Sequence, residues 1–409
     1  MRAALARRGA EVGLDELIAL DADARALRTR VEERRAEVSQ LARKIGEARK
    51  RGKEPSSTEE HTARALRSGV TALESQLREL EARRDAQLLT LPNLPEEDAP
   101  PGGEDDAVEL RRVGDLPSFD FEPRDHVEIG VALGGLDLER AARTSGARFA
   151  YLLGPLVRLQ IALECFALDL LEREGFIPVV PPVLVREEAM WGTGFFPTDR
   201  ASIYRTADDD LFLVGTSEVP LAALHADEIL EGDALPLRYA GVSTCFRREA
   251  GAAGRDTRGI FRVHQFDKIE MFSFTTPDAS REEHLRLVGL QETILGALEI
   301  PYRVVDIAVG DLGASAARKF DCEAWLPSQG RYREVTSCSN CTDYQARRLR
   351  ARRRVEGGTA PTHTLNGTAV AIGRTIVALL ENGQRHDGSV ALPKALGAFG
   401  APAELVPAE

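Results

Sequence analysis

Residues 245–270 bring together side chains that could bind a nucleotide. Arg247 and Arg248 are adjacent, Glu249 follows them, and Phe266 and Glu270 lie at the other end of the segment. Arginine offers a planar fork of donors for phosphate, glutamate accepts a hydrogen bond from an amine, and phenylalanine gives a face on which a base stacks. The chain contains neither a GxxxxGKS/T nor a GxGxxG pattern, so the segment predicts a nucleotide site without a P-loop. The alternative is a solvated turn.

Two antiparallel strands joined by a loop would position these side chains. Alternating residues lead into Arg247 and resume after the loop, and Gly251, Gly254 and Gly259 punctuate the loop itself. Glycines at such spacing between alternating runs indicate a hairpin with a long, turn-rich connection. The hairpin would bring arginine, glutamate and an aromatic ring to one side of a sheet.

From about residue 108 the chain mixes helices and alternating strands without a regular strand–helix repeat. This predicts an α+β domain around a largely antiparallel sheet with flanking helices. One helix is well marked, because Pro155 begins it, an apolar stripe follows, and Gly175 ends it. Residues 176–185 then read as an apolar strand with Pro181 and Pro182. Prolines in a strand predict a dimer contact, with a plain surface edge as the alternative.

Residues 14–91 are rich in Arg, Glu, Ala and Leu and contain two apolar stripes. The stripes cover residues 17–45 and 66–91 with spacings of three and four, and a breaker at residues 52–57, including Pro55, separates them. This pattern predicts an antiparallel coiled-coil hairpin. The plain interpretation of such a hairpin is a dimerisation or spacer arm.

Six basic residues gather at the tip of this predicted hairpin, and only Glu47 and Glu54 oppose them. The six are Arg43, Lys44, Arg49, Lys50, Arg51 and Lys53. A charge run is often only a solvated surface. The protein as a whole has a formal net charge of -12, however, so a local basic tip favours a partner with a phosphate backbone.

The chain is longer than one ordinary domain, with 409 residues of which 43% are hydrophobic. Residues 93–110 are rich in proline, glycine and acidic side chains, which predicts a linker. We therefore expect an arm at residues 1–92 and a larger domain at residues 111–409. The acidic balance excludes a protein that coats nucleic acid nonspecifically.

Five cysteines without a disulfide framework predict a reducing compartment, the cytoplasm. We find neither a signal peptide nor an apolar run of membrane-spanning length, so no membrane is expected. Cys338 and Cys341 form a C-x-x-C pair, but a structural zinc site would want a second pair at matching spacing. We therefore expect ordinary thiols and no zinc, with metal binding as the weaker alternative.

Several motifs, in order along the chain, resemble those of the class II aminoacyl-tRNA synthetases. The helix and strand ending in Gly175 and Pro182 resemble motif 1, the segment with Arg247 and Phe266 resembles motif 2, and residues 365–374 resemble motif 3. Further stretches are similar to the bacterial seryl-tRNA synthetases: Thr216-Ser217-Glu218, and residues 255–259, 264–266, 319–325 and 334–341. The resemblance covers nearly the whole chain, including the hairpin.

The resemblance implies ATP-dependent formation of seryl-adenylate from L-serine, followed by transfer of serine to tRNA(Ser), and also to tRNA(Sec), by a homodimer that uses Mg²⁺. The implied catalytic residues are Arg247 and Arg374. The implied ATP-binding residues are Arg247, Arg248, Glu249, Phe266, Glu334, Val335, Thr336, Ser337 and Arg374. The implied serine-binding residues are Thr216, Ser217, Glu218, Arg247, Glu270 and Thr368. Glu334 and Ser337 would hold Mg²⁺, and the six basic tip residues would contact tRNA.

Residues 250–259, in the loop of motif 2, are expected to close over ATP and then meet the acceptor end of tRNA. Two other functions are compatible with a synthetase-like core. A non-catalytic tRNA-binding paralogue would show a broken motif 2 or motif 3, and both motifs look whole here. An amino-acid:carrier-protein ligase on the same core would lack a long tRNA-binding arm, whereas this chain has one.

Overall fold

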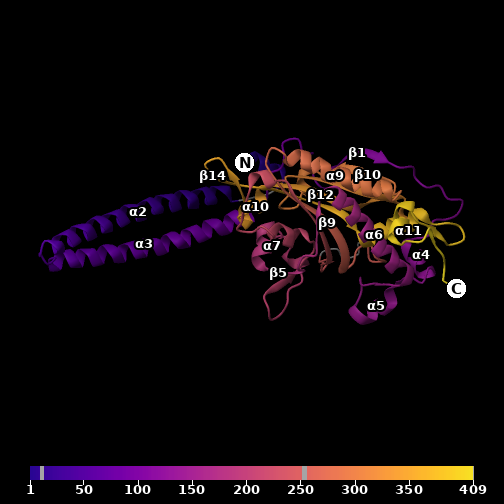
Figure 1. The fold of residues 1–409 in the computed structure, drawn as a ribbon, viewed down its shortest axis with the longest axis horizontal. Coiled ribbons are helices and arrows are strands. Elements are labelled where there is room, and N and C mark those ends of the chain that lie inside the picture. The colour runs from indigo at the N-terminus through magenta and orange to yellow at the C-terminus, as the bar shows by residue number, and fades with distance from the viewer. Residues whose placement is uncertain (10–12, 251–255, 409) are drawn as a thin grey trace. The chain divides into compact units, whose positions relative to one another are not determined.

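The computed structural model describes residues 1–9, 13–250 and 256–408 (Figure 1). The chain forms two compact units. One comprises Arg2 and residues 10–91, and the other comprises Met1, residues 3–9 and residues 92–409. The first unit is called the arm.

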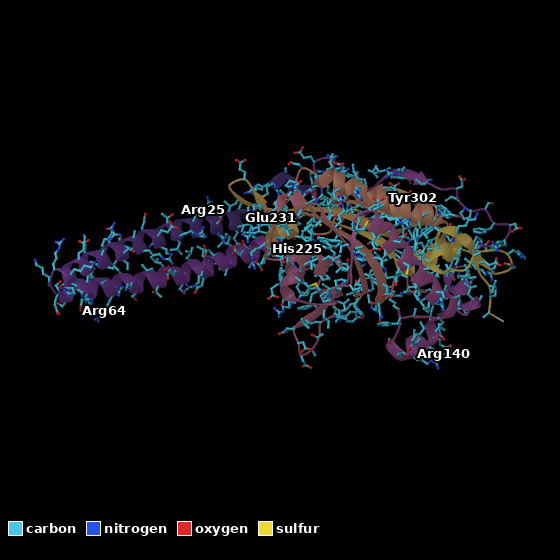
Figure 2. The ribbon with its side chains drawn as sticks, in the orientation of Figure 1. Arg25, Arg64, Arg140, His225, Glu231 and Tyr302 are labelled. Carbon is cyan, nitrogen blue, oxygen red and sulfur yellow. The ribbon has the colours of Figure 1, made fainter. Side chains whose placement is uncertain are left out.

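The arm consists of two long helices, α2 (Leu14–Lys50) and α3 (Ser57–Thr90). They run antiparallel, because early residues of α2 pair with late residues of α3. Arg84 lies 3.5 Å from Asp21, Arg35 2.7 Å from Glu74, and Arg49 3.7 Å from Glu60. Charged side chains cover both helices (Figure 2). The predicted coiled-coil hairpin is confirmed.

A capping box begins α3 at the turn of the hairpin. The Ser56 hydroxyl accepts a hydrogen bond from the Glu59 amide at 3.2 Å, and the Ser56 amide donates to the Glu59 carboxylate at 2.9 Å. These two bonds satisfy donors that the first turn of a helix leaves free. The first turn of α3, which begins at Ser57, is therefore capped.

An eight-stranded sheet forms the centre of the second unit, with the order β1-β10-β11-β12-β15-β9-β8-β4. All neighbouring pairs are antiparallel except β4 and β8, which are parallel. The strands are β1 (Val108–Val113), β10 (Tyr302–Asp306), β11 (Arg318–Leu326), β12 (Arg331–Thr342), β15 (His363–Ala371), β9 (Gln265–Thr275), β8 (Leu237–Phe246) and β4 (Ile177–Val179). The α+β fold predicted from the sequence is confirmed.

Three helices pack on this sheet and share one apolar core: α6 (Gly154–Arg173), α9 (Ser280–Ala297) and α11 (Ile372–Gly383). In α6, Pro155 lies in the first turn, as predicted, where a missing amide hydrogen costs nothing. Leu156, Leu159 and Leu163 of the same helix are completely buried. The core thus holds the sheet rigid beneath any site on its other face.

The shorter elements complete the unit. The helices are α1 (Arg2–Arg7), α4 (His126–Ala132), α5 (Leu138–Ser145), α7 (Glu187–Thr193), α8 (Glu218–Ala223) and α10 (Tyr344–Leu349). The strands are β2 (Leu136–Asp137), β3 (Tyr151–Leu152), β5 (Leu184–Arg186), β6 (Leu211–Leu213), β7 (Ile229–Leu230), β13 (Arg352–Val355), β14 (Gly358–Pro361), β16 (Val390–Ala391) and β17 (Glu404–Leu405).

The single strand expected at residues 176–185 is two strands in the structure, and that expectation was wrong. β4 ends at Val179 and pairs with β8 at the sheet edge, whereas β5 begins at Leu184 and pairs with β6 in a separate sheet. Pro181 and Pro182 lie between them, and a proline has no amide hydrogen to continue a ladder. None of the helices in the described ranges is long and apolar enough to cross a membrane.

Candidate active site

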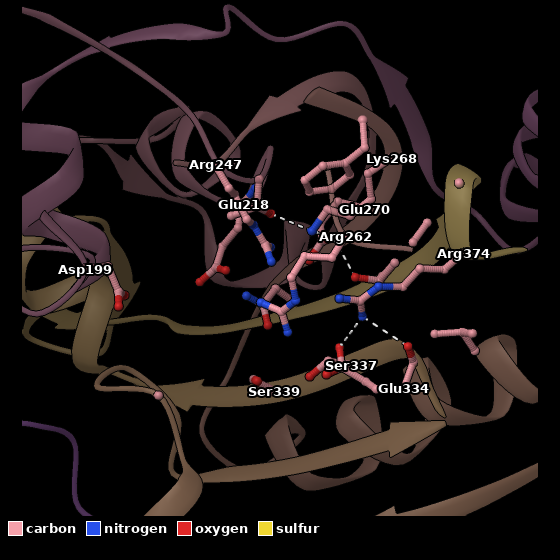
Figure 3. Close-up of a pocket in the computed structure, with 18 of the residues that line it drawn as sticks. Asp199, Glu218, Arg247, Arg262, Lys268, Glu270, Glu334, Ser337, Ser339 and Arg374 are labelled. Carbon is pink, nitrogen blue, oxygen red and sulfur yellow. Dashed lines mark hydrogen bonds and ion pairs between the residues drawn. The ribbon is translucent and has the colours of Figure 1, made fainter. Parts of the chain in front are cut away.

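A pocket lies on the sheet, over β8, β9, β12 and β15 (Figure 3). Its walls carry many charged side chains from strands far apart in the sequence. The lining includes Glu218, Arg247, Glu249, Arg262, Phe266, Lys268, Glu270, Lys319, Glu334, Val335, Ser337, Asn366, Thr368 and Arg374. The sequence-predicted residues from motifs 2 and 3 therefore meet in one cavity.

Arg247 follows β8 and is fixed on both sides before any ligand binds. Its backbone amide donates to the His264 carbonyl at 2.9 Å, and its side-chain Nε donates to the Gly215 carbonyl at 3.3 Å. The guanidinium lies 5.2 Å from the centre of the Phe266 ring. Cys245 pairs with Phe266 in the antiparallel ladder of β8 and β9. The predicted hairpin with its arginine and aromatic on one side is thus present.

Arg374, near the start of α11, faces the same pocket from the other side. Its Nη1 donates to the Glu334 carboxylate at 2.9 Å and to the Glu334 carbonyl at 3.1 Å. The ring of Phe261 lies 5.0 Å from the guanidinium carbon of Arg374 and 4.1 Å from that of Arg333. Phe261 is a second aromatic wall, which the sequence motifs do not predict although it lies only five residues before Phe266.

Glu334 and Ser337 lie on β12 along the floor of the pocket (Figure 3). Loss of hydration raises the pKa of Glu334, but the cations of Arg374, Lys319 and Arg247 outweigh it and hold that pKa below its usual value. Glu334 is therefore ionised. The ladder with β11 shifts register between Cys322 and Glu323, leaving Val335 without a partner.

A divalent cation fits this part of the pocket. Mg²⁺ prefers oxygen ligands and takes one or two carboxylates together with substrate phosphates. The Glu334 carboxylate and the Ser337 hydroxyl supply such oxygens from one strand. Asp321 pairs with Ser337 across the ladder, and its buried Oδ1 has no hydrogen-bond partner among the described residues. Glu334 and Ser337 thus offer hard oxygen ligands, whereas Asp321 lies outside the pocket lining and burial raises its pKa to about 7.

The opposite wall contains a buried cluster of acids and one cation. The Lys268 ammonium lies 2.5 Å from a Glu270 carboxylate oxygen and donates to the Thr216 hydroxyl at 2.7 Å. The Thr368 hydroxyl donates to the same Glu270 oxygen at 3.2 Å. Lys268 was not among the residues predicted from the sequence, although it lies two positions before Glu270 on one strand.

Glu218 forms the second acidic centre of this wall. Gln345 donates to its carboxylate at 2.7 Å, and the Glu218 amide donates to the Thr216 hydroxyl at 3.2 Å. Burial, followed by the charge of Glu270, raises the pKa of Glu218 to about 7. Two neighbouring carboxylates with one lysine make a site that favours a small cation such as an ammonium group.

Three residues predicted for the site do not line the pocket. The Ser217 hydroxyl donates to the Gly241 carbonyl at 3.4 Å behind the wall. Thr336 is buried elsewhere, because β12 turns its side chains alternately to opposite faces. The Arg248 amide donates to the Ser202 carbonyl at 2.8 Å, and its side chain is not part of the pocket lining. Glu249 does line the pocket, where it accepts from Arg262 at 2.7 Å.

A buried histidine holds the segment between the loop and β9. The Ile260 amide donates to His126 Nε2 at 3.2 Å, so His126 carries its proton on Nδ1, which lies 3.2 Å from Glu381. Glu381 is completely buried and also accepts from the Ser328 hydroxyl at 2.7 Å. Gly259 has a φ of +83°, and a Cβ there would lie 1.9 Å from His126 Nε2. Residues 251–255 of the predicted lid lie outside the described residues.

The structure also places the six basic residues predicted at the tip of the hairpin and the two cysteines of the C-x-x-C pair. The six basic residues Arg43, Lys44, Arg49, Lys50, Arg51 and Lys53 are exposed at the end of α2 and in the turn that follows. Cys338 and Cys341 are buried and free, and burial raises the pKa of the Cys338 thiol well above its ordinary value.

An antiparallel sheet with one arginine at the end of β8 and a second near the start of α11, both facing one pocket, has the arrangement expected for the core of a class II aminoacyl-tRNA synthetase. Residues 202–383 match the family model for the tRNA synthetase class II core domain (G, H, P, S and T), and residues 1–95 match that for the seryl-tRNA synthetase N-terminal domain. The chain belongs to the seryl-tRNA synthetase family.

Full-length relatives and solved structures agree with this assignment. The serine–tRNA ligase of Acidothermus cellulolyticus is 54% identical over 97% of this chain and 94% of its own length, and that of Nocardia farcinica is 52% identical over 98% and 94%. The seryl-tRNA synthetase of Pyrococcus horikoshii, solved with ATP, has a TM-score of 0.92 at 43% identity and covers 99% of this chain and 96% of its own. The Naegleria fowleri enzyme, solved with AMP, reaches 0.89 at 34% identity, covering 100% and 95%.

Proposed function

We propose that this chain activates L-serine with ATP to form seryl-adenylate and then transfers serine to the 3′ end of tRNA(Ser). The observation that carries the proposal is one pocket in which two arginines and an aromatic wall face a buried acidic cluster. The relatives named above are serine–tRNA ligases, and two related synthetases were solved with ATP or AMP. Each half of the pocket would then bind a ligand group of opposite charge: the arginines the phosphates of ATP, and the acidic cluster the ammonium group of serine.

Adenine and the phosphates of ATP would occupy the half of the pocket between Arg247 and Arg374. Phe266 would stack on the base, Arg247 would hold the α-phosphate, and Arg374 would reach the γ-phosphate. Glu249 and Val335 line the same half. Glu334 and Ser337 would hold Mg²⁺, which neutralises phosphate charge when bound. Arg248 and Thr336 would act only indirectly, because their side chains lie outside the pocket lining.

Serine would occupy the half with the buried acids. Glu218 and Glu270 would attract its ammonium group, Thr368 and Glu270 would bond its hydroxyl, and Arg247 would receive its carboxylate. Thr216 would keep Glu218 and Lys268 in place through its hydroxyl, while Ser217 supports the backbone of the wall. A pocket that hydrogen-bonds a hydroxyl rejects alanine, because its polar groups would be left unpaired.

The chemistry follows from bringing two anions together. A serine carboxylate oxygen attacks the α-phosphorus, and the bond to the bridging oxygen of pyrophosphate breaks. The ribose hydroxyl of tRNA then attacks the serine carbonyl carbon, AMP departs with the electron pair of the broken bond, and the hydroxyl proton is lost to AMP or water. The fixed cations of Arg247 and Arg374 stabilise the charge on the transferring groups without rearranging. No general base is assigned.

We also propose a homodimer, and an uncovered apolar surface supports it. Val157 and Ile161, one turn apart on α6, are exposed on the side opposite the buried stripe of that helix. Ile177 and Val180, at β4 and just after it, are 54% and 85% exposed. Large apolar side chains gathered on one surface mark a protein interface. A second copy of the chain is the partner that the family membership favours.

The arm would bind tRNA(Ser) through its basic tip, and tRNA(Sec) would be charged as well if it presents the same shape. Recognition of folded RNA by shape and backbone charge suits a rod with exposed arginines and lysines. The five cysteines are free, which supports a reducing compartment such as the cytoplasm.

The test of this function is ATP–pyrophosphate exchange across the amino acids, followed by charging of bulk tRNA. We expect exchange with serine and charging of the serine-accepting fraction. Absence of pyrophosphate exchange would indicate that the protein is a non-catalytic tRNA-binding module. Exchange without any tRNA charging would instead indicate an amino-acid:carrier-protein ligase.

A further inference from the structure

One wall of the pocket is a loop to which neither ATP nor serine has been assigned. Gly313, Ser315 and Ala316 of this loop line the cavity. Ser339 and Asp199 line the same end, which lies opposite Arg374 in Figure 3. Transfer requires a third reactant, the ribose of tRNA, to reach the serine carbonyl. The end of the pocket at residues 312–316 is a part of the lining that neither ATP nor serine would occupy.

Two residues bind every carbonyl oxygen of this loop. Arg8 donates to the carbonyls of Leu312 at 2.8 Å, Gly313 at 2.6 Å and Ala316 at 2.8 Å. Asn93 donates to the other two, from its amide to Ala314 at 2.8 Å and from its side chain to Ser315 at 2.8 Å. Five consecutive carbonyls therefore point to Arg8 and Asn93, which we call the root clamp.

The root clamp is specific in its chemistry. Arginine has five donors in a fixed plane, and here they reach several carbonyls of one turn at once, which a lysine ammonium cannot reproduce. Among the described residues no carboxylate forms an ion pair with Arg8, so its donors serve backbone oxygens. Asn93 also donates to the Cys341 carbonyl at 2.8 Å and to the Thr342 hydroxyl at 3.0 Å, which ties the loop to the end of β12.

The two residues of the root clamp flank the arm in the sequence. Arg8 precedes residues 10–91, and Asn93 follows them. The two are also joined directly, because Arg8 donates to the Asn93 carbonyl at 2.9 Å. The chain therefore enters and leaves the arm through residues that shape the pocket wall.

We propose that Arg8 and Asn93 are positioning residues for the transfer step, holding residues 312–316 in the shape that admits the terminal ribose of tRNA. This inference rests on the proposed function. The root clamp touches neither ATP-binding nor serine-binding residues, so its effect belongs to transfer and not to activation. Because reaction geometry depends on sub-ångström placement, a loosened wall slows transfer strongly.

The test uses full-length Arg8→Ala, Arg8→Lys and Asn93→Ala, with Arg7→Ala as the matched control. Arg7 directly precedes Arg8 as the last residue of α1 and donates to the carbonyls of Glu96 at 3.1 Å and Ala99 at 2.7 Å, away from the pocket loop. Three quantities are measured: serine-dependent pyrophosphate exchange, single-turnover transfer from preformed seryl-adenylate to tRNA, and the melting temperature.

We expect transfer to slow about tenfold or more in the Arg8 and Asn93 variants while exchange stays within about threefold of wild type. Arg7→Ala should transfer at nearly the wild-type rate. Equal transfer in Arg7→Ala and the root-clamp variants, or a matching loss of exchange, would overturn the inference. If Arg8→Ala does not fold, Asn93→Ala decides by the same criteria. Failure of the wild-type protein to exchange with serine would instead overturn the proposed function.

Discussion

Arg247 is placed by the protein before any substrate arrives. Its backbone amide donates to the His264 carbonyl just beyond the β8–β9 ladder, its Nε donates to the Gly215 carbonyl, and its guanidinium lies over Phe266. A cation held in this way does not have to reorganise while charge develops on a transferring group. If Arg247 holds the α-phosphate as proposed, its energetic benefit should therefore appear in the transition state and not only in binding.

Replacing Arg247 by alanine should reduce serine-dependent pyrophosphate exchange by about 100-fold or more. The reason is that the transferring phosphate loses its fixed cation, while the strand pair keeps its backbone bonds. Exchange kinetics and the melting temperature are the measurements. Arg140→Ala, an exposed arginine outside the pocket, serves as the control. Near-normal exchange in Arg247→Ala would show that the arginine is not part of activation.

The affinity for serine should depend on pH through Glu218. Since burial raises its pKa to about 7, the carboxyl is mostly neutral below that pH and mostly charged above it. A charged Glu218 attracts the serine ammonium, so KM for serine should fall between about pH 6 and about pH 8. Steady-state exchange as a function of pH and serine concentration measures this.

Glu218→Gln is the matched control for the pH dependence. The amide keeps the size of the side chain but cannot ionise, so KM for serine should be higher and should no longer change through neutral pH. A variant that retains the wild-type pH profile would assign the titration to a different group.

The sequence motifs located the arginines and the acidic residues but not their neighbours. Arg247, Phe266, Glu270, Glu334 and Thr368 all line the pocket, as expected from their positions in the motifs. Ser217 and Thr336 belong to the same motif stretches but point elsewhere, because a motif contains the residues between the functional ones. The direction of Thr336 is set by strand alternation next to the register shift at Val335, and that of Ser217 by its place at the start of α8, none of which residue type reveals.

At the scale of elements, distant segments complete the site in ways that no local pattern shows. Gln345 on α10 reaches Glu218 on α8, and His126 on α4 reaches the Ile260 amide. These contacts depend on helix packing. Lys268 is different, since its position two residues before Glu270 places both side chains on one face of β9. That spacing could have identified it.

His126 should affect ATP binding without affecting serine binding. His126→Ala removes the acceptor of the Ile260 amide and frees the segment that carries Phe261, so KM for ATP should rise about tenfold while KM for serine stays nearly constant. His126→Gln can still accept near Nε2, whereas His126→Asn can only donate near Nδ1. Pyrophosphate exchange should therefore be rescued better by glutamine. Equal defects in both variants would contradict the role of the Ile260 bond.

At the scale of the whole molecule, composition and periodicity predicted the coiled-coil hairpin and the α+β class correctly. The hairpin was predictable because its stripes and breaker are local signals. The strand order of the sheet was not, because β1 pairs with β10 and β15 with β9 across long stretches of chain. The root clamp could not be predicted from the sequence, because Arg8 and Leu312 are far apart in the chain.

Deleting residues 33–79 should separate the two activities of the proposed enzyme. The deletion removes the basic tip and most of the paired helices but leaves the pocket unit intact, so pyrophosphate exchange should remain close to wild type. Charging of tRNA should fall by about 100-fold or more, because the backbone contacts that hold tRNA are lost. Parallel exchange and charging assays measure both effects. Charging that survives the deletion would make the arm a spacer.

The hydrogen bond between Arg8 and the Asn93 carbonyl brings together the two points where the chain leaves for the arm and returns from it. An insert whose ends are neighbours can be exchanged without stretching its host. The hairpin can therefore be exchanged as a unit. If the arm binds tRNA as proposed, a grafted hairpin of different length between the same two residues should change which transfer RNA is charged.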